Sequence, residues 1–168
     1  RDLTLVLVLA VVFVFLVLLF EFRNFSAPIA ILTSAVLATS GAFVALFLTG
    51  ITFNLSSFMG VIMVIGIVAK NGILLLDADV KFRGAGFSAQ EAVIQAGRRR
   101  LRPILMTAIA AAVGFLPLAL AIGSGSEMLQ PLAIAVIGGL LIATVLSLMV
   151  TPAIYFYLTR NTNEMKTV

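Results

Sequence analysis

Long apolar stretches, separated by short polar or glycine-containing connections, dominate the chain. A helix that crosses the roughly 30 Å hydrocarbon core of a bilayer needs about 20 mostly apolar residues, because each residue advances it by about 1.5 Å. Five stretches meet this requirement, so we predict an all-α fold, a polytopic transmembrane bundle of about five spanning helices. The predicted spans are residues 3–20, 27–48, 55–80, 103–122 and 129–158.

The connection between the third and fourth spans carries its own helix pattern. Ser88 followed by Glu91 is the sequence of a capping box, and Phe87 stands where a hydrophobic staple residue would. The residues that follow place small and apolar side chains on one face and end in arginines. We predict a short interfacial helix over 89–99 that lies on the cytoplasmic leaflet. A solvated loop helix is the alternative.

Small residues recur at four-residue spacing within several predicted spans. Such spacing lets helix backbones approach closely in lipid, so we expect these positions to face other helices of the bundle. The sets are Ala38 and Ala42; Ala110 and Gly114; and Ala135, Gly139 and Ala143.

Composition supports a membrane protein and excludes several kinds of chemistry. Of the 168 residues, 62% are hydrophobic and only 11% are charged, against about 25% charged in soluble domains. Cysteine and histidine are both absent, which excludes a disulfide framework and the commonest transition-metal ligands. The sequence contains no glycine-rich phosphate loop. We therefore predict neither an enzyme nor a bound cofactor.

The basic residues predict the orientation of the helices. If five spans alternate, nine lysines and arginines share one side, and only Arg1 stands on the other. By the positive-inside rule, the N-terminus is periplasmic and the C-terminus cytoplasmic. A start at Arg1 on the outer side also suggests a fragment of a larger protein. The net charge of +4 does not indicate nucleic acid binding, because the charges sit at helix ends beside lipid. The nine residues are Arg23, Lys81, Arg83, Arg98, Arg99, Arg100, Arg102, Arg160 and Lys166.

Lys70 lies deep in the third predicted span, within IGIVAKNGILLLD. A lysine near the centre of a bilayer costs on the order of 3 kcal/mol, so such residues are usually functional. We expect a buried cation inside the bundle that pairs with a carboxylate or senses one. A structural cation held by backbone carbonyls and water is the alternative.

No carboxylate of this chain is expected at the depth of Lys70. Asp77 follows two turns later on roughly the same face, about 10 Å along the axis. Asp79 points in another direction, and both aspartates fall near the cytoplasmic end, where exposure at the interface is the simpler interpretation. Glu21 and Glu127 also stand at helix ends. The partner of Lys70 is therefore predicted to lie outside this chain.

Arg100 and Thr107 form a second candidate pair. They are seven residues apart in RRRLRPILMT, which places them on one helix face. Alternatively, Arg100 belongs to a group of positive-inside anchors, and the Thr107 hydroxyl bonds to a carbonyl of its own helix.

Several strings resemble one known family in the same order. AKNGILLLD, RLRPILMT and VIGGLLIATVLSLMVTPAIY, with GFSAQEAVIQAGRRRLRPILMT and the turn AIGSGSE, resemble the C-terminal membrane half of resistance–nodulation–division (RND) efflux pump subunits. The resemblance covers nearly the whole chain. It implies a proton-driven secondary transporter of the bacterial inner membrane with twelve helices, two periplasmic domains and a trimeric assembly.

The resemblance also implies roles for particular residues. Lys70, Arg100 and Thr107 match the lysine, arginine and threonine of the family's proton relay, and Asn71 and Asp77 are possible relay or orienting residues. The family's aspartate pair and its helix have no counterpart here, so the rest of the subunit is an expected partner. A periplasmic adaptor and an outer-membrane channel are implied too. The lysine–asparagine motif resembles the drug-exporting branch, which handles amphiphiles, more than the heavy-metal branch.

Three alternatives to a pump segment stay open from the sequence. The first is an inactive structural membrane fragment. The second is a small transporter or channel that completes its pathway by oligomerisation. The third is a heavy-metal or protein-export member of the same superfamily.

Overall fold

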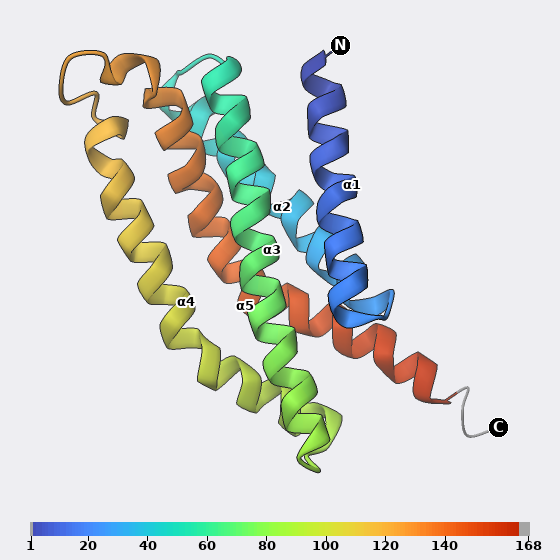
Figure 1. Ribbon diagram of the computed structural model, residues 1–168. Helices are drawn as coiled ribbons and strands as arrows, with labels where there is room; N and C mark the ends of the chain where they lie inside the picture. The colour runs from blue at the N-terminus through green and yellow to red at the C-terminus, as the bar shows by residue number, and fades with distance from the viewer. Residues whose placement is uncertain (1, 165–168) are drawn as a thin grey trace.

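A computed structural model describes residues 2–164 as a bundle of long helices (Figure 1). Five of its helices are long and apolar enough to cross a membrane, which confirms the predicted all-α, multi-span fold. A short 3-10 helix, η1 (Ser126–Met128), lies in the connection before the last of them. The long helices are α1 (Asp2–Phe22), α2 (Ser26–Thr49), α3 (Leu55–Gly84), α4 (Ala89–Ala119) and α5 (Gln130–Glu164).

Helices α2, α3 and α5 form the packed centre, and α1 and α4 lie outside it on opposite sides (Figure 1). In the most apolar 18-residue segment of α3 and of α5, 56% and 50% of the segment is buried. The corresponding fraction is only 6% in both α1 and α4. The two outer helices therefore present most of their apolar side chains to lipid or to protein outside this chain.

Glycines and alanines bring the central helices into close contact. A Cβ atom built at Gly41 would lie 2.7 Å from the carbonyl oxygen of Gly138, so these two backbones touch. A Cβ built at Gly60 would lie 2.9 Å from the Cβ of Ala135. The small-residue spacing thus identified contact faces of α2 and α5 correctly. Ala110 and Gly114 are exposed, because that face of α4 has no neighbour among the described residues, so their expected contact with another helix stays a prediction.

Side-chain caps fix where two of the long helices begin. At the start of α4, the Glu91 amide donates to Ser88 Oγ and the Ser88 amide donates to Glu91 Oε2, which confirms the predicted capping box. The start of α3 has a second capping box, which was not predicted from the sequence. There the Ser57 amide donates to Asn54 Oδ1, and the Asn54 amide donates to Ser57 Oγ.

Helix α4 differs from the prediction of two separate segments. Residues 89–99 are the first three turns of a helix that continues through Pro103 to Ala119. Proline removes one backbone hydrogen bond and crowds the carbonyl four residues earlier, so it can bend a helix without ending it. Figure 1 shows α4 changing direction in its first half. The position of its first turns at the membrane interface stays a prediction.

Helix α5 also continues through a proline, beyond the predicted end at residue 158. Pro152 cannot donate to the Leu148 carbonyl, and the second half of α5 turns away from the first (Figure 1). One residue before Pro152, the Thr151 hydroxyl hydrogen-bonds to the buried Ser34 hydroxyl of α2 at 2.7 Å. Lys166, which is predicted to be on the cytoplasmic side, lies outside the described residues.

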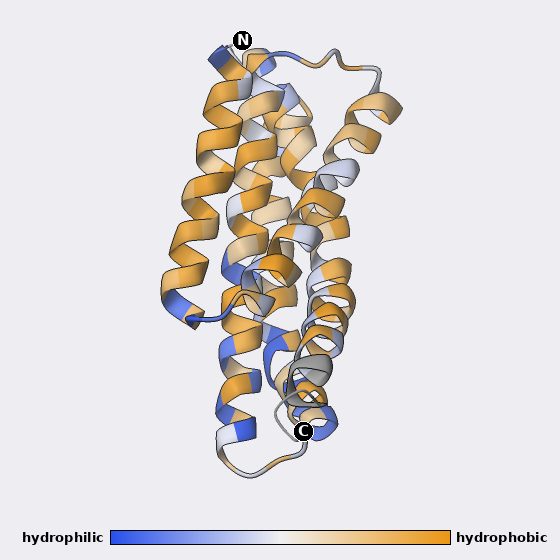
Figure 2. Cartoon of the chain, turned by 90° about the vertical axis from the view of Figure 1, so that its right-hand side faces the viewer, coloured by the Kyte–Doolittle hydropathy of each residue, from blue (hydrophilic) through white to orange (hydrophobic). Residues whose placement is uncertain are grey.

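Hydrophilic residues gather toward one end of the bundle, around the α3–α4 connection (Figure 2). The start of α1 and the connection through η1 lie at the other end (Figure 1). The basic residues of the α3–α4 connection are thus separated from Glu127 by the length of the helices. This separation is what the predicted orientation requires, and the orientation itself stays a prediction.

Candidate functional site

Three of the predicted site residues line one small cavity between α3, α4 and α5. Lys70 and Asn71 come from α3 and Thr107 from α4, and the cavity measures about 120 Å³. Asn71 is buried. A space of this size admits a few water molecules, and each of the three side chains can hydrogen-bond to water. Apolar side chains complete the walls: Ile67, Ala108, Ala111 and Leu140.

Lys70 is not buried within this chain, contrary to the expectation of a buried cation. Its side chain is exposed, and it also borders a groove of about 350 Å³ between α1 and α3. The physical reason is that α1 and α4 flank this face of α3 without covering it. Among the side chains of residues 2–159, which the structure describes, Lys70 has neither an ion pair nor a hydrogen-bond partner. The groove is lined mainly by apolar residues, including Phe13, Val17 and Gly66.

The Thr107 hydroxyl donates a hydrogen bond to the Ile104 carbonyl of its own helix, at 3.0 Å. The alternative raised from the sequence, a bond within the helix, is therefore present. A hydroxyl that donates in this way keeps its acceptor lone pairs. Because Thr107 lines the cavity beside Lys70, its oxygen is available there as an acceptor.

Arg100 does not join this cavity. It lines a different one, of about 350 Å³, between the end of α3 and the start of α4, together with Lys81, Phe82 and Arg99. Its Nε atom is buried and has no hydrogen-bond partner among the described residues. The Arg99 guanidinium lies 5.9 Å from the centre of the Phe82 ring. The structure therefore separates Arg100 from Lys70, although Arg100 and Thr107 come from the same helix.

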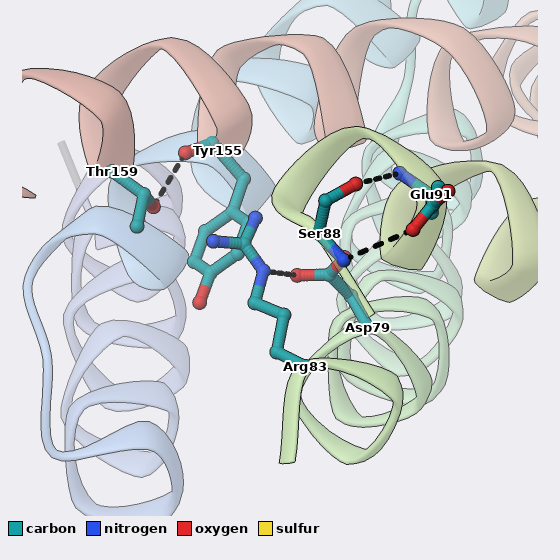
Figure 3. Close-up of polar contacts among 6 residues, drawn as sticks. All are labelled: Asp79, Arg83, Ser88, Glu91, Tyr155 and Thr159. Atoms are coloured by element: carbon teal, nitrogen blue, oxygen red, sulfur yellow. Dashed lines mark hydrogen bonds and ion pairs between the residues drawn. The ribbon is translucent and has the colours of Figure 1, made fainter. Parts of the chain in front are cut away.

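The two aspartates of α3 have different surroundings. Asp77 pairs with Lys81 at 2.8 Å on an exposed face, away from Lys70. Asp79 was predicted to be exposed at the interface, but it is buried at 1% exposure and pairs with Arg83 at 2.8 Å. The Arg83 guanidinium also lies over the ring of Tyr155 from α5, 5.3 Å from its centre (Figure 3). The cluster of Asp79, Arg83 and Tyr155 was not predicted from the sequence. The available signal was the opposite charge of Asp79 and Arg83 at a spacing of four residues, which favours an ion pair within a helix.

Comparison with known proteins identifies the family. The sequence profile described as the AcrB/AcrD/AcrF family matches residues 1–159. The chain belongs to this family. This membership agrees with the RND resemblance of the AKNGILLLD and RLRPILMT strings, and it does not distinguish a multidrug subtype.

Relatives of the AcrB/AcrD/AcrF family match nearly the whole chain. The swarming motility protein SwrC of Bacillus subtilis (strain 168) is 42% identical over 155 residues, which are 92% of this chain and 15% of SwrC. Two crystal forms of a heavy metal efflux pump share 39% identity, with TM-scores of 0.83 and 0.78. They cover 94% and 92% of this chain and 15% of the pump in each case. The chain thus spans about a seventh of the length of these relatives.

Proposed function

We propose that this chain forms part of an efflux transporter driven by the proton gradient, and that Lys70, Arg100 and Thr107 belong to its transmembrane proton relay. The observation that carries the proposal is the cavity shared by Lys70, Asn71 and Thr107. A lysine at this depth without a counter-charge among the side chains of residues 2–159 requires one from elsewhere. Membership of the AcrB/AcrD/AcrF family supports a partner helix in the rest of the subunit, carrying the aspartate pair that the resemblance implies.

The geometry around Lys70 suggests how a proton changes the structure. Lys70 borders both the open groove beside α1 and the cavity with Asn71 and Thr107. When the partner carboxylates are charged, the ammonium pairs with them across its exposed face. Protonation of a carboxylate weakens this attraction, and the ammonium then turns to the oxygens of Asn71 and Thr107. Two orientations of the Lys70 side chain thus respond to one proton, as coupling requires.

Arg100 acts at a distance from the movement of the Lys70 ammonium between its two sets of partners. Its cavity lies toward the basic end of the bundle, which we propose to be cytoplasmic. A fixed positive charge there lowers the local concentration of cations and favours ionised carboxylates further along the path. Asp77 is held by Lys81 near the same end, where it orients Lys81 rather than contacting Lys70.

The whole transporter is proposed to be an inner-membrane homotrimer with a periplasmic N-terminus and a cytoplasmic C-terminus for this segment. A periplasmic adaptor and an outer-membrane channel follow from the family resemblance alone. Two substrate classes are candidates. The lysine–asparagine motif favours drugs and other amphiphiles, whereas the solved relatives are a heavy metal efflux pump.

Transport by the purified full-length parent in proteoliposomes tests this proposal. An imposed pH gradient is expected to drive substrate movement and to be dissipated by it. Parallel assays with an amphiphilic dye and with a metal-sensitive fluorophore separate the two substrate classes. ATP-driven transport, or transport indifferent to the pH gradient, would reject the proposal. The isolated chain is expected to insert without transporting, because Lys70 lacks its counter-charge.

Substitution of Thr107 tests the cavity directly. Thr107→Ala removes the acceptor oxygen and is expected to lower efflux about tenfold, the equivalent of losing one hydrogen bond of about 1.4 kcal/mol in the rate-limiting step. Thr107→Ser keeps the oxygen and should retain at least half of the activity. Efflux rates at matched protein level in energised cells provide the measurement. Equal activity of the alanine and serine variants would remove Thr107 from the relay.

A further inference from the structure

Helix α3 carries two ion pairs of the same spacing in different surroundings. Asp77–Lys81 and Asp79–Arg83 are both four residues apart, and both have a shortest N···O distance of 2.8 Å. The Asp77 and Lys81 side chains are 38% and 72% exposed, whereas those of Asp79 and Arg83 are 2% and 20% exposed. Only the second pair is removed from solvent, and it is removed by residues of this chain.

The buried pair reaches a second helix through Arg83. Its guanidinium lies 5.3 Å from the centre of the Tyr155 ring, and Tyr155 belongs to the part of α5 that follows the bend at Pro152 (Figure 3). A cation over an aromatic face is attracted more strongly when both groups are desolvated. Tyr155 is itself buried among residues of α1, α2 and α3. Arg83 therefore ties the last part of α5 to the end of α3.

The hydrogen bonding of the pair indicates that Asp79 orients Arg83. One bond joins Arg83 Nε to Asp79 Oδ2. Asp79 Oδ1 and Arg83 Nη2 are buried and have no partner among the described residues, so the two-bond fork that strengthens such pairs is not formed. A buried pair with unused donors and acceptors adds little net stability. It does restrict the guanidinium to the direction that meets the Tyr155 ring.

The position of this cluster on α3 links it to Lys70. Asp79 follows Lys70 by nine residues, about two and a half helical turns, so the two side chains leave α3 on opposite faces. Contact of the Asp79 face with α5 consequently sets the rotation of α3 about its axis. That rotation decides whether Lys70 and Asn71 point to the cavity that contains Thr107.

We propose that Asp79, Arg83 and Tyr155 are positioning residues of the proton relay, which they serve by fixing the rotation of α3 against α5. This inference rests on the proposed function, and it adds residues that the relay itself does not contain. The Tyr155 ring is the required group. The contact with Arg83 is made by the face of the ring, and the Thr159 hydroxyl donates to the Tyr155 backbone carbonyl.

The contact of Asp79 and Arg83 with Tyr155 is called the anchor below. A distance measurement tests this anchor independently of transport. The chain has no cysteine, so spin labels can be placed at Val80→Cys and Tyr157→Cys, which are both exposed, in the reconstituted parent with any other cysteines replaced. Arg83→Gln is expected to broaden or shift the α3–α5 distance distribution. The matched control Arg98→Gln removes an exposed arginine and should leave the distribution unchanged.

Efflux measurements then test the positioning role. Arg83→Gln and Tyr155→Leu are each expected to lower efflux about tenfold at normal protein level, because a small misplacement of relay groups slows the reaction. Their effects should not multiply in the double variant, since both break one contact. Tyr155→Phe keeps the ring and should retain wild-type efflux. Tyr155→Leu keeps the ion pair, so it remains informative if Arg83→Gln fails to fold.

Each outcome separates this inference from the proposed function. An unchanged distance distribution in Arg83→Gln, or equal damage from Tyr155→Phe and Tyr155→Leu, would overturn the anchor. A broadened distribution with normal efflux would leave the anchor but reject its link to the relay. If Lys70→Ala transports normally while the anchor variants change the distance, the proposed relay fails and the contact between α3 and α5 stands alone.

Discussion

Replacing Lys70 by alanine in the full-length parent is expected to reduce efflux at least about 100-fold at unchanged protein level. The substitution leaves the partner carboxylates inside the membrane without a cation, and removing one member of such a pair costs about 3–5 kcal/mol. Even the lower value corresponds to more than a hundredfold change in rate when it falls on the coupling step. Dye efflux from energised cells, with protein level measured in parallel, provides the test.

Two further variants make this result specific. Lys70→Arg keeps the charge but replaces a compact ammonium with a planar fork, so it should recover only a small part of the activity. Arg98→Ala removes an exposed cation from α4 and should transport normally. Efflux near the wild-type rate in Lys70→Ala would show that Lys70 is a tolerated cation, and the relay proposed here would be abandoned.

Gly138→Leu is expected to destabilise the packing of α5 against α2 at the centre of the bundle. A Cβ atom at this position would collide with the Cβ of Ala45 and lie 2.7 Å from the carbonyl oxygen of Gly41. A backbone carbonyl cannot rotate away as a flexible side chain can, so α2 and α5 must separate. Overpacking of cores typically costs about 1–3 kcal/mol, and four added carbons at a backbone contact should reach or exceed the upper value.

The loss of stability would be measured as thermal aggregation of the detergent-solubilised parent, monitored by size-exclusion chromatography. Gly84→Leu is the matched control, because an added Cβ there has no atom within 4 Å and the residue is exposed at the end of α3. The control should elute and melt as the wild type does. A Gly138→Leu protein with an unchanged melting temperature would mean that the α2–α5 contact is not close in the assembled transporter.

The apolar pattern predicted the fold well because the length of a span depends on bilayer thickness, a property independent of tertiary contacts. Its errors concern the helix ends and the prolines. Helix α3 ends at Gly84 rather than near residue 80, since charged residues continue a helix beyond the hydrocarbon. Pro103 and Pro152 bend their helices without ending them. Whether proline bends or breaks a helix depends on packing that the local sequence does not contain.

The candidate site was predictable where one helix carries the information. Lys70 and Asn71 are neighbours on α3, and Thr107 was assigned by a motif, so finding them at one cavity required only that α3 and α4 pack together. Their roles in a relay stay predictions. The different environments of Asp77 and Asp79 were not predictable, because they depend on which face of α3 meets α5. Two residues of separation turn a side chain by about 200° around a helix.

The contact between Gly41 and Gly138 has a consequence for biosynthesis. These residues are about 100 positions apart, so at roughly 5–20 residues per second the second enters the membrane many seconds after the first. Helix α2 must therefore wait in the lipid, with its glycine and alanine face unoccupied, until α5 emerges from the ribosome. During that interval α2 is open to premature partners, such as a chaperone, an insertase or another nascent helix. The centre of the bundle is complete only when α5, which is made after α2, has joined it.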